Sequence, residues 1–302
     1  MSSAPDGWKN QGGEPNYGSN GADFVMSKPG DAPTIISNVY IMYGNVEMQV
    51  RSAAGKGVVS SAHLQSDCLD EIDWEWLGSD PGQVQTNYYR MGKPDHTKAT
   101  FVNFGGHQDD FHTYTIDWTD KRITWSIDGN NVRTLTTEEA GDSYPQSPMA
   151  LHVGPWAGGD PDQSPEGTVG TNIPPTFLVS RSDTNSMIVE WAGGPMDWGQ
   201  APFTMSVKSI KMTDYSTGSK YSYSDNSCTA GSIKADGGDV DGEGSPDDEV
   251  TNPPPSPTND SHDNADNNDN PNTNPPSKPT DENNKNNPTA PPKGMPQPSR
   301  CH

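Results

Sequence analysis

The stretch Asp70-Glu71-Ile72-Asp73-Trp74-Glu75-Trp76-Leu77-Gly78 decides the fold of this chain. Acidic residues alternate in it with large apolar ones, which is typical of a β-strand. Side chains at positions i, i+2 and i+4 of a strand share one face of the sheet. We therefore expect Glu71, Asp73 and Glu75 to line one surface while the apolar residues between them enter a hydrophobic core.

Three carboxylates in one row repel each other, so the pKa of at least one of them should rise. An ionised carboxylate beside a protonated one is what cleavage of a glycosidic bond with retention requires. Two alternatives stay open, an acidic solvated strand face and a site for a hard metal ion. No further acidic cluster in the folded part completes a metal shell, so neither a metal nor another cofactor is expected.

The same run resembles the active-site strand of glycoside hydrolase family 16. More narrowly, it resembles the fungal Crh-like transglycosylases, which join chitin to β-glucan in the cell wall. The resemblance covers roughly residues 17 to 234, with further matching motifs in the family's order at Val39–Gly44, Gly57–Ser61, Gln83–Tyr88, Phe111–Trp118, Gly154–Gly159 and Glu190–Gly194.

The resemblance implies a role for each carboxyl group of the row. Glu71 is the expected nucleophile, Glu75 the general acid/base, and Asp73 a hydrogen-bonding partner that tunes the charge of Glu71. Retention requires a carboxyl separation of about 5–5.5 Å. A covalent glycosyl-enzyme would then pass its sugar to a hydroxyl group of another sugar chain or to water.

Residues outside the row are candidates for holding the sugar. Gln85 and Asn87 share strand parity after the catalytic strand, so they are expected to hydrogen-bond the donor sugar, unless they are ordinary outer-face polar residues. Flat aromatic platforms are also expected, because sugar rings pack on them. The candidates in Gly-rich loops are Trp156, Trp191 and Trp198, with core packing as the alternative for each, and Tyr89 is a further candidate by its parity.

Other aromatic and histidine residues are expected to be structural. Trp118 and Trp125 lie in regular alternating runs, which predicts the core or the floor of a cleft. His107 and His112 lie near no Ser or Cys constellation.

Many short alternating runs punctuated by Gly and Pro predict an all-β sandwich. An Asp128-Gly129 turn predicts a hairpin, and the only helical signal is a turn near Thr137 to Ala140. The resemblance sharpens the fold to a curved, concanavalin-like jelly roll with a cleft on its concave face. Strands are expected at 22–26, 34–36, 39–43, 45–50, 111–118, 123–127, 132–135 and 203–212.

Composition bounds the partners of the chain. Of its 302 residues 29% are hydrophobic, and the net charge of −22 argues against nucleic acid or an anionic membrane as a partner. Neutral polysaccharides such as chitin and β-glucan are compatible with this charge. No apolar run approaches the roughly 20 residues of a membrane span, and a monomer is expected.

Composition also predicts three regions. Residues 1–21 are expected to form a loose lead-in, 22–234 the catalytic domain and 235–302 a disordered acidic tail rich in Asp, Asn and Pro. Relatives usually have a short loop where this chain has residues near 165–188. That stretch is either a real insertion at the cleft rim or an error of the gene prediction.

Three cysteines leave at least one thiol without an internal partner. Cys68 is expected in the core, and a pair between Cys228 and Cys301 stays open.

No signal peptide or lipid-anchor signal is visible, although the resemblance implies an extracellular location in a fungal cell wall. The leading function is chitin–glucan transglycosylation. The alternatives are a hydrolytic endo-β-glucanase or chitinase, and an inert carbohydrate-binding wall protein.

Overall fold

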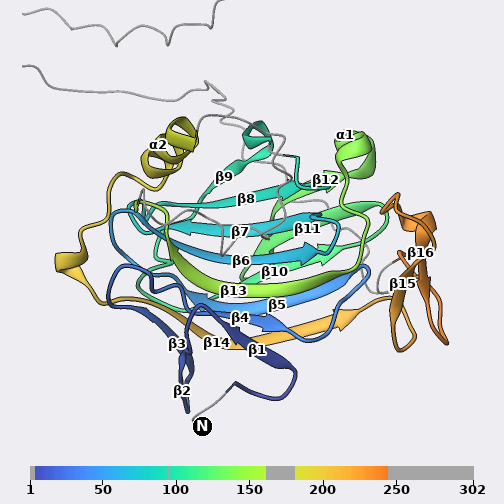
Figure 1. Cartoon of the computed structure of the whole chain (residues 1–302), viewed down its shortest axis with the longest axis horizontal. Coiled ribbons are helices and arrows are strands. Elements are labelled where there is room, and N and C mark those ends of the chain that lie inside the picture. The colour runs from blue at the N-terminus through green and yellow to red at the C-terminus, as the bar shows by residue number, and fades with distance from the viewer. Residues whose placement is uncertain (1–3, 94, 161–180, 244–302) are drawn as a thin grey trace, which may run out of the picture. The chain divides into compact units, whose positions relative to one another are not determined.

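The computed structural model describes residues 4–93, 95–160 and 181–243, which form two antiparallel sheets of seven strands and one separate hairpin (Figure 1). The first sheet has the order β1 (Trp8–Gln11), β4 (Thr34–Ser37), β13 (Met149–Ala157), β6 (Val58–Ser66), β7 (Glu71–Leu77), β8 (Gln83–Tyr89) and β9 (Thr100–Asn103). The second has the order β12 (Asn130–Thr136), β11 (Arg122–Ile127), β10 (His112–Trp118), β5 (Gly44–Arg51), β14 (Phe203–Asp214), β3 (Gly21–Met26) and β2 (Asn16–Gly18). The hairpin joins β15 (Tyr221–Tyr223) to β16 (Ile233–Ala235).

The expected sandwich is confirmed, and its core holds β7 in place. Trp74 and Trp76 are fully buried, and their rings lie 5.3 and 4.7 Å from the ring of Tyr114 on β10. Trp125 of β11 donates from Nε1 to the backbone oxygen of Asp73 at 3.0 Å. The strand that carries the acidic row is therefore anchored from behind by the opposite sheet.

The predicted Asp-Gly hairpin is also confirmed. Asp128 and Gly129 have φ angles of 49° and 79°, and they connect the paired residues Ile127 and Asn130. Two successive residues with positive φ suit a two-residue turn between twisted strands.

The segment 39–43 is not a strand, contrary to the prediction. Here the chain leaves β4 in the first sheet and enters β5 in the second, so it cannot continue one ladder. Tyr43 has a φ of 64°, and Ile41 makes only an isolated bridge to Met149.

The expected loose lead-in is wrong as well. Its residues supply β1, which pairs with β4, and β2, which pairs with β3. Each is the outermost strand of its sheet. An edge strand is held by backbone hydrogen bonds on one side only, and its polar side chains can stay in water, so composition did not reveal it.

Within the described ranges, two short helices flank the sheets. Helix α1 (Thr137–Ala140) occupies the predicted turn, and Thr136 and Glu139 form a capping box at its start. Helix α2 (Arg181–Trp191) was not predicted. Of the stretch near 165–188, residues 165–180 lie outside the described residues, while the rest belongs to α2. Four 3₁₀ turns are described, at His96–Lys98, Gly141–Ser143, Trp198–Gln200 and Ala230–Ser232.

The boundary predicted at residue 234 lies too early. The backbone nitrogen of Asp120 donates to Gly242 at 2.9 Å, and that of Thr217 donates to Asp239 at 2.9 Å. Val240 packs against the main core. Residues 235–243 thus belong to the folded unit, whereas 244–302 lie outside the described residues.

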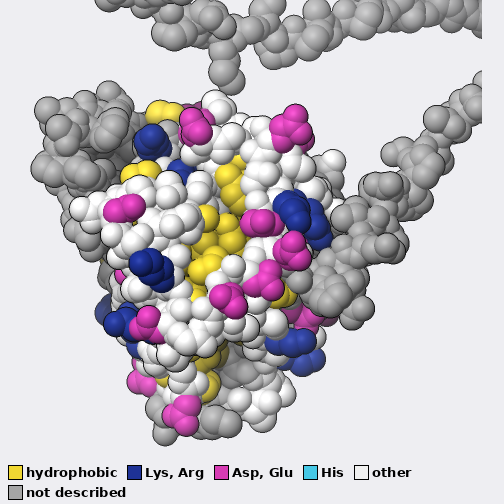
Figure 2. Space-filling view, turned by 90° about the vertical axis from the view of Figure 1, so that its right-hand side faces the viewer, with side chains coloured by type: hydrophobic (Ala, Val, Ile, Leu, Met, Phe, Trp, Pro, Cys, Tyr) yellow, Lys and Arg dark blue, Asp and Glu magenta, His cyan; other side chains and the backbone are white. Residues whose placement is uncertain are grey.

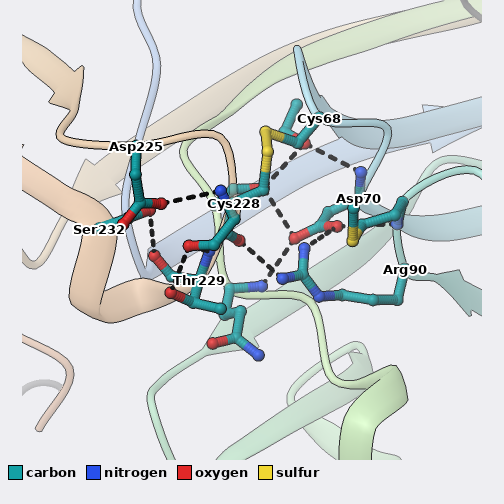
Figure 3. Close-up of a disulfide and its surroundings, with 12 residues drawn as sticks. Cys68, Asp70, Arg90, Asp225, Cys228, Thr229 and Ser232 are labelled. Carbon is teal, nitrogen blue, oxygen red and sulfur yellow. Dashed lines mark hydrogen bonds and ion pairs between the residues drawn. A yellow bond between two sulfur atoms is a disulfide. The ribbon is translucent and has the colours of Figure 1, made fainter.

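Cys68 is not a free core residue but forms a disulfide with Cys228, with their Cα atoms 6.2 Å apart (Figure 3). The bond ties the turn before β7 to the segment between β15 and β16. Cys301 lies outside the described residues.

One face of the molecule carries a hydrophobic strip. On the side that carries the β15–β16 hairpin, acidic side chains follow this strip along one edge (Figure 2). No helix within the described ranges is long and apolar enough to cross a bilayer.

Candidate active site

The register of β6, β7 and β8 places each acidic residue of β7 in a separate cross-strand row, so that there are three such rows. Each carboxyl residue of β7 has one partner on either neighbouring strand. The rows are Gln65–Glu71–Tyr89, His63–Asp73–Asn87 and Ser61–Glu75–Gln85.

This face of the sheet is recessed. Its side chains point away from the sandwich core, yet Asp73, Gln85 and Asn87 are only 3%, 4% and 2% exposed. A flat outer face would leave such polar side chains in water. The alternative of a solvated acidic strand face is therefore wrong.

Glu75 lies where its carboxyl group is buried beside another carboxyl group. Burial and the nearby charge of Glu71 raise the pKa of Glu75 to about 8. Its Oε2 accepts a hydrogen bond from Nε2 of Gln85 at 3.1 Å. At neutral pH the Glu75 carboxyl group therefore holds its proton.

Glu71 is surrounded by hydrogen-bond donors instead. Burial raises the pKa of Glu71 on balance, and hydrogen bonds from Asp73 and from Gln65 Nε2, the latter at 2.9 Å, limit the rise. Burial and the charges of Glu71 and Glu75 hold the pKa of Asp73 well above its usual range. A protonated Asp73 that donates to an ionised Glu71 satisfies both groups. The three carboxyl groups along β7 thus combine an ionised carboxylate with protonated neighbours.

Two of the three predicted tryptophan platforms are connected to Glu75 through Gln85. Trp191 donates from Nε1 to Oε1 of Gln85 at 2.8 Å, and its ring stacks on Trp156 with centroids 6.0 Å apart. Both half-buried rings pack on the small apolar cluster of Val59, Leu77 and Ala192. They do not lie in loops, because Trp156 belongs to β13 and Trp191 ends α2.

The third candidate platform is placed elsewhere. Trp198 lies in a 3₁₀ turn, and its ring packs edge-on against Phe203 at the start of β14, with centroids 6.1 Å apart. It is not part of the three rows.

Asn87 and Tyr89 lie in the rows, as their parity predicts. Nδ2 of Asn87 donates to the Tyr89 hydroxyl at 2.7 Å. Burial and the three nearby carboxyl groups raise the pKa of Tyr89, so its phenol stays protonated. Its hydroxyl can thus donate onward to a ligand.

Several residues of this face were missed. Ser61, His63 and Gln65 come from β6, where polar and apolar residues alternate just before β7, and this alternation was the available signal. Phe101 of edge strand β9 pairs with Gln85, and 47% of its surface is exposed. An exposed ring on this face is a further candidate platform.

The residues expected to be structural have internal partners. His107 contacts Ser52 Oγ at 2.7 Å and the Asp80 carbonyl at 3.0 Å, and Nδ1 of His112 lies 2.7 Å from Asp128. Trp118 and Trp125 are fully buried in the core. In the described part of the chain, no group of three or more His, Cys, Asp or Glu residues is arranged to hold a metal ion.

Comparison with known proteins gives consistent matches. The family model for glycosyl hydrolases family 16 matches residues 6–173. Crh-like protein 4 of Aspergillus fumigatus is 50% identical over 232 residues, which are 76% of this chain and 47% of the relative. Congo red hypersensitive protein 1 of Saccharomyces cerevisiae is 43% identical over 76% of this chain and 41% of its own length. This chain spans about half the length of these curated relatives.

Solved structures match as well. Crh5 transglycosylase, solved without ligand and in complex with NAG, is 44% identical with a TM-score of 0.68, covering 78% of this chain and 90% of that chain. A β-glucanase of Bacillus licheniformis shares the fold at 24% identity and a TM-score of 0.52, covering 70% of this chain and 94% of that one.

Proposed function

This chain belongs to glycosyl hydrolases family 16, within its Crh-like group, and on that basis we propose that it is a retaining transglycosylase of fungal cell-wall polysaccharide. Its donor would be a chitin-type β-1,4 chain and its acceptor a β-glucan. The observation that carries the proposal is the split protonation of the row, with Glu75 protonated and Glu71 receiving hydrogen bonds.

The two glutamates divide the chemistry. Glu75 gives its proton to the glycosidic oxygen while the Glu71 carboxylate attacks the anomeric carbon, so the leaving chain departs as an alcohol. The result is a covalent glycosyl-enzyme on Glu71. Glu75, now a carboxylate, takes the proton of an incoming hydroxyl group, whose oxygen displaces Glu71. Two inversions leave the anomeric configuration retained.

Asp73 serves the nucleophile in this scheme. Its hydrogen bond to Glu71 favours the ionised form before attack, and it lowers the cost of releasing the carboxylate when the glycosyl-enzyme is resolved. Gln65 on β6 supplies a second donor to the same carboxylate.

The stacked pair Trp156–Trp191, together with Gln85 and Tyr89, is proposed to bind sugar rings on either side of the cleaved bond. The hydrogen bond from Trp191 to Gln85 couples this aromatic surface to Glu75. Trp198 and Asn87 remain candidates with a smaller part, because Trp198 packs on Phe203 and Asn87 donates to Tyr89.

The hydrolytic alternative uses the same carboxyl groups and differs only in the acceptor. The similarity to a protein solved as a transglycosylase and bound to NAG favours transfer. An inert binding protein would have no need of carboxyl groups with opposed protonation. The extracellular location and the monomeric state proposed for this chain rest on the resemblance and the composition.

Product analysis tests the function. The protein is incubated with chitin oligosaccharides and a fluorescent glucan oligomer, and the products are identified by mass. Hybrid chains are expected, and they should be absent with the Glu71→Gln variant. Shortened chitin chains without hybrids would replace the proposal with hydrolysis, and unchanged substrates would support an inert protein.

A further inference from the structure

His63 occupies the middle row of the recessed face. On β6 it lies between His152 of β13 and Asp73 of β7, directly opposite both in the strand register. Its ring stacks on that of His152, with centroids 4.9 Å apart and planes at 24°. The side chain is only 8% exposed, so water does not compensate its polar atoms.

The two ring nitrogens of His63 differ in their surroundings. Nδ1 lies 3.1 Å from the hydroxyl oxygen of Ser61, whereas Nε2 is buried and has no hydrogen-bond partner among the described residues. A serine hydroxyl that donates to Nδ1 leaves the proton of a neutral imidazole on Nε2. Burial and the neighbouring His152 lower the pKa of His63, which keeps the ring neutral.

Asp73 shows the complementary pattern. Its carboxyl group hydrogen-bonds Glu71, while the oxygen Oδ1 is buried and lacks a partner within the described residues. Leaving a buried polar group without a hydrogen bond destabilises the folded state. Opposite residues of an antiparallel pair have Cβ atoms about 4.5–5.5 Å apart. The register therefore places a free donor and a free acceptor on directly opposite residues of neighbouring strands.

We propose that His63 is a positioning residue for the catalytic carboxyl row: in the working site its Nε2–H donates to Oδ1 of Asp73, which keeps the Asp73 proton on the oxygen that faces Glu71. The inference deepens the proposed function and rests on it for the role of Glu71. His63 touches no reacting atom in this scheme and acts only through Asp73.

The consequence concerns the charge of Glu71. Without His63, the Asp73 proton can reside on either oxygen, and Glu71 loses a donor for part of the time. The pKa of Glu71 then rises, so a higher pH is needed to ionise the nucleophile. Other titratable and charged groups surround His63 and Asp73. They are Glu71 and Glu75 on β7, His152 on β13, Tyr89 on β8 and Arg133 on β12.

The kinetic test compares pH profiles of kcat/KM for the full chain and three variants. His63→Ala should lower kcat/KM about tenfold or more and move its acid limb upward by about half a unit or more. His63→Gln, whose amide can donate, should restore most of the limb position. His152→Phe keeps an aromatic ring against His63 and should leave the limb in place. A uniform loss at all pH values, with no rescue by Gln, would show a merely structural role.

A second measurement needs no activity. Long-range ¹H–¹⁵N correlation spectra of the wild-type protein report which nitrogen of a histidine carries the proton. The Nε2–H tautomer is expected for His63, and an Nδ1–H tautomer overturns the inference even if His63→Ala fails to fold. Wild-type protein inactive on every sugar tested would instead defeat the proposed function, and the tautomer would still be readable.

Discussion

Glu71 and Glu75 are chemically identical side chains on one strand, and their neighbours make them different. Gln65 and Asp73 donate to Glu71, whereas burial beside the Glu71 charge keeps the proton on Glu75. Because the roles follow from the surroundings, each glutamate should fail in its own way when it is replaced.

If Glu75 is the proton donor, a nucleophile that needs no base should rescue the activity lost when Glu75 is replaced. Glu75→Gln should still form the glycosyl-enzyme from a substrate with an activated aryl leaving group, which requires little protonation. Azide should then restore turnover and give a product of retained configuration, measured by NMR of the glycosyl azide. Glu71→Ala with azide should give the inverted product, because azide attacks the substrate directly.

The stereochemistry decides between the two assignments. An inverted azide product from the Glu75 variant would mean that the nucleophile and the acid/base are exchanged.

Asp73→Asn serves as the matched control on the same strand. It should reduce activity less than either glutamate variant, because Asp73 is proposed to tune the charge of Glu71 without touching the substrate.

The raised pKa of Glu75 also predicts how stability depends on pH. The folded-state pKa of about 8 exceeds the unfolded value of about 4.3. The folded state therefore binds more protons in this window, and stability falls as pH rises from about 4.3 to about 8. Glu75→Gln removes this loss, so its Tm should exceed that of the wild type most clearly near pH 8. Parallel Tm curves of the two proteins from pH 5 to 8 would contradict the assignment.

Phe101 should act as a sugar platform at the edge of the recessed face. Phe101→Ala is expected to raise KM about 2–10-fold with little change in kcat, because ring stacking is lost in both the ground state and the transition state. Val39→Ala is the control, since Val39 is 56% exposed in the segment that crosses between the sheets. Equal KM values for the wild type and the Phe101 variant would remove Phe101 from the site.

At the scale of elements, the turn between β6 and β7 fixes where the catalytic strand begins. Asp70 is fully buried there. Its carboxylate accepts hydrogen bonds from Arg90 Nη1 at 2.6 Å, from the Gln146 backbone nitrogen at 2.9 Å and from Ser147 Oγ at 2.7 Å. Arg90 in turn donates to the Cys228 carbonyl at 2.7 Å, next to the disulfide (Figure 3).

Breaking this buried pair should be costly. Asp70→Ala leaves the buried Arg90 guanidinium without an opposite charge and is expected to lower the free energy of unfolding by about 3–5 kcal/mol. The Lys28–Asp31 pair has the same 2.6 Å separation, but Lys28 is 75% exposed. Lys28→Ala should therefore cost at most about 1 kcal/mol. Urea unfolding measures both variants, and similar losses would refute the assigned importance of burial.

The regular strands and the acidic row could be predicted because period-two alternation reports which face is buried. Residues 71–75 show this most clearly. The Asp128-Gly129 turn could be predicted for another reason, because these residue types favour a two-residue hairpin turn. Edge strands β1 and β2, helix α2 and the Cys68–Cys228 pair could not be predicted in the same way. They depend on backbone hydrogen bonds or on contacts between distant segments, which leave no local pattern. The importance of His63 likewise appears only when β6, β7 and β13 are side by side.

At the scale of the whole molecule, the position where the folded unit ends is testable. Ending the chain after residue 243 should leave Tm within a degree or two, since residues 244–302 offer few apolar side chains to bury. Ending it after Ala235 removes Val240 from the core and the bond to Gly242. Tm should then fall by several degrees, at about 2–4 °C per kcal/mol for a domain of this size. Identical melting of the two truncated forms would show that residues 236–243 contribute nothing.

The Cys68–Cys228 bond closes a loop with a sequence separation of 160 residues, and this loop contains the whole acidic row. A single cut of the backbone anywhere within it cannot release either fragment while the bond persists. A protease that nicks the chain between α2 and β13 would produce a two-chain species of unchanged mass, apart from one added water. Such a species would run as one band on a non-reducing gel and as two after reduction, and β14 would stay covalently tied to the fragment that carries Glu71 and Glu75.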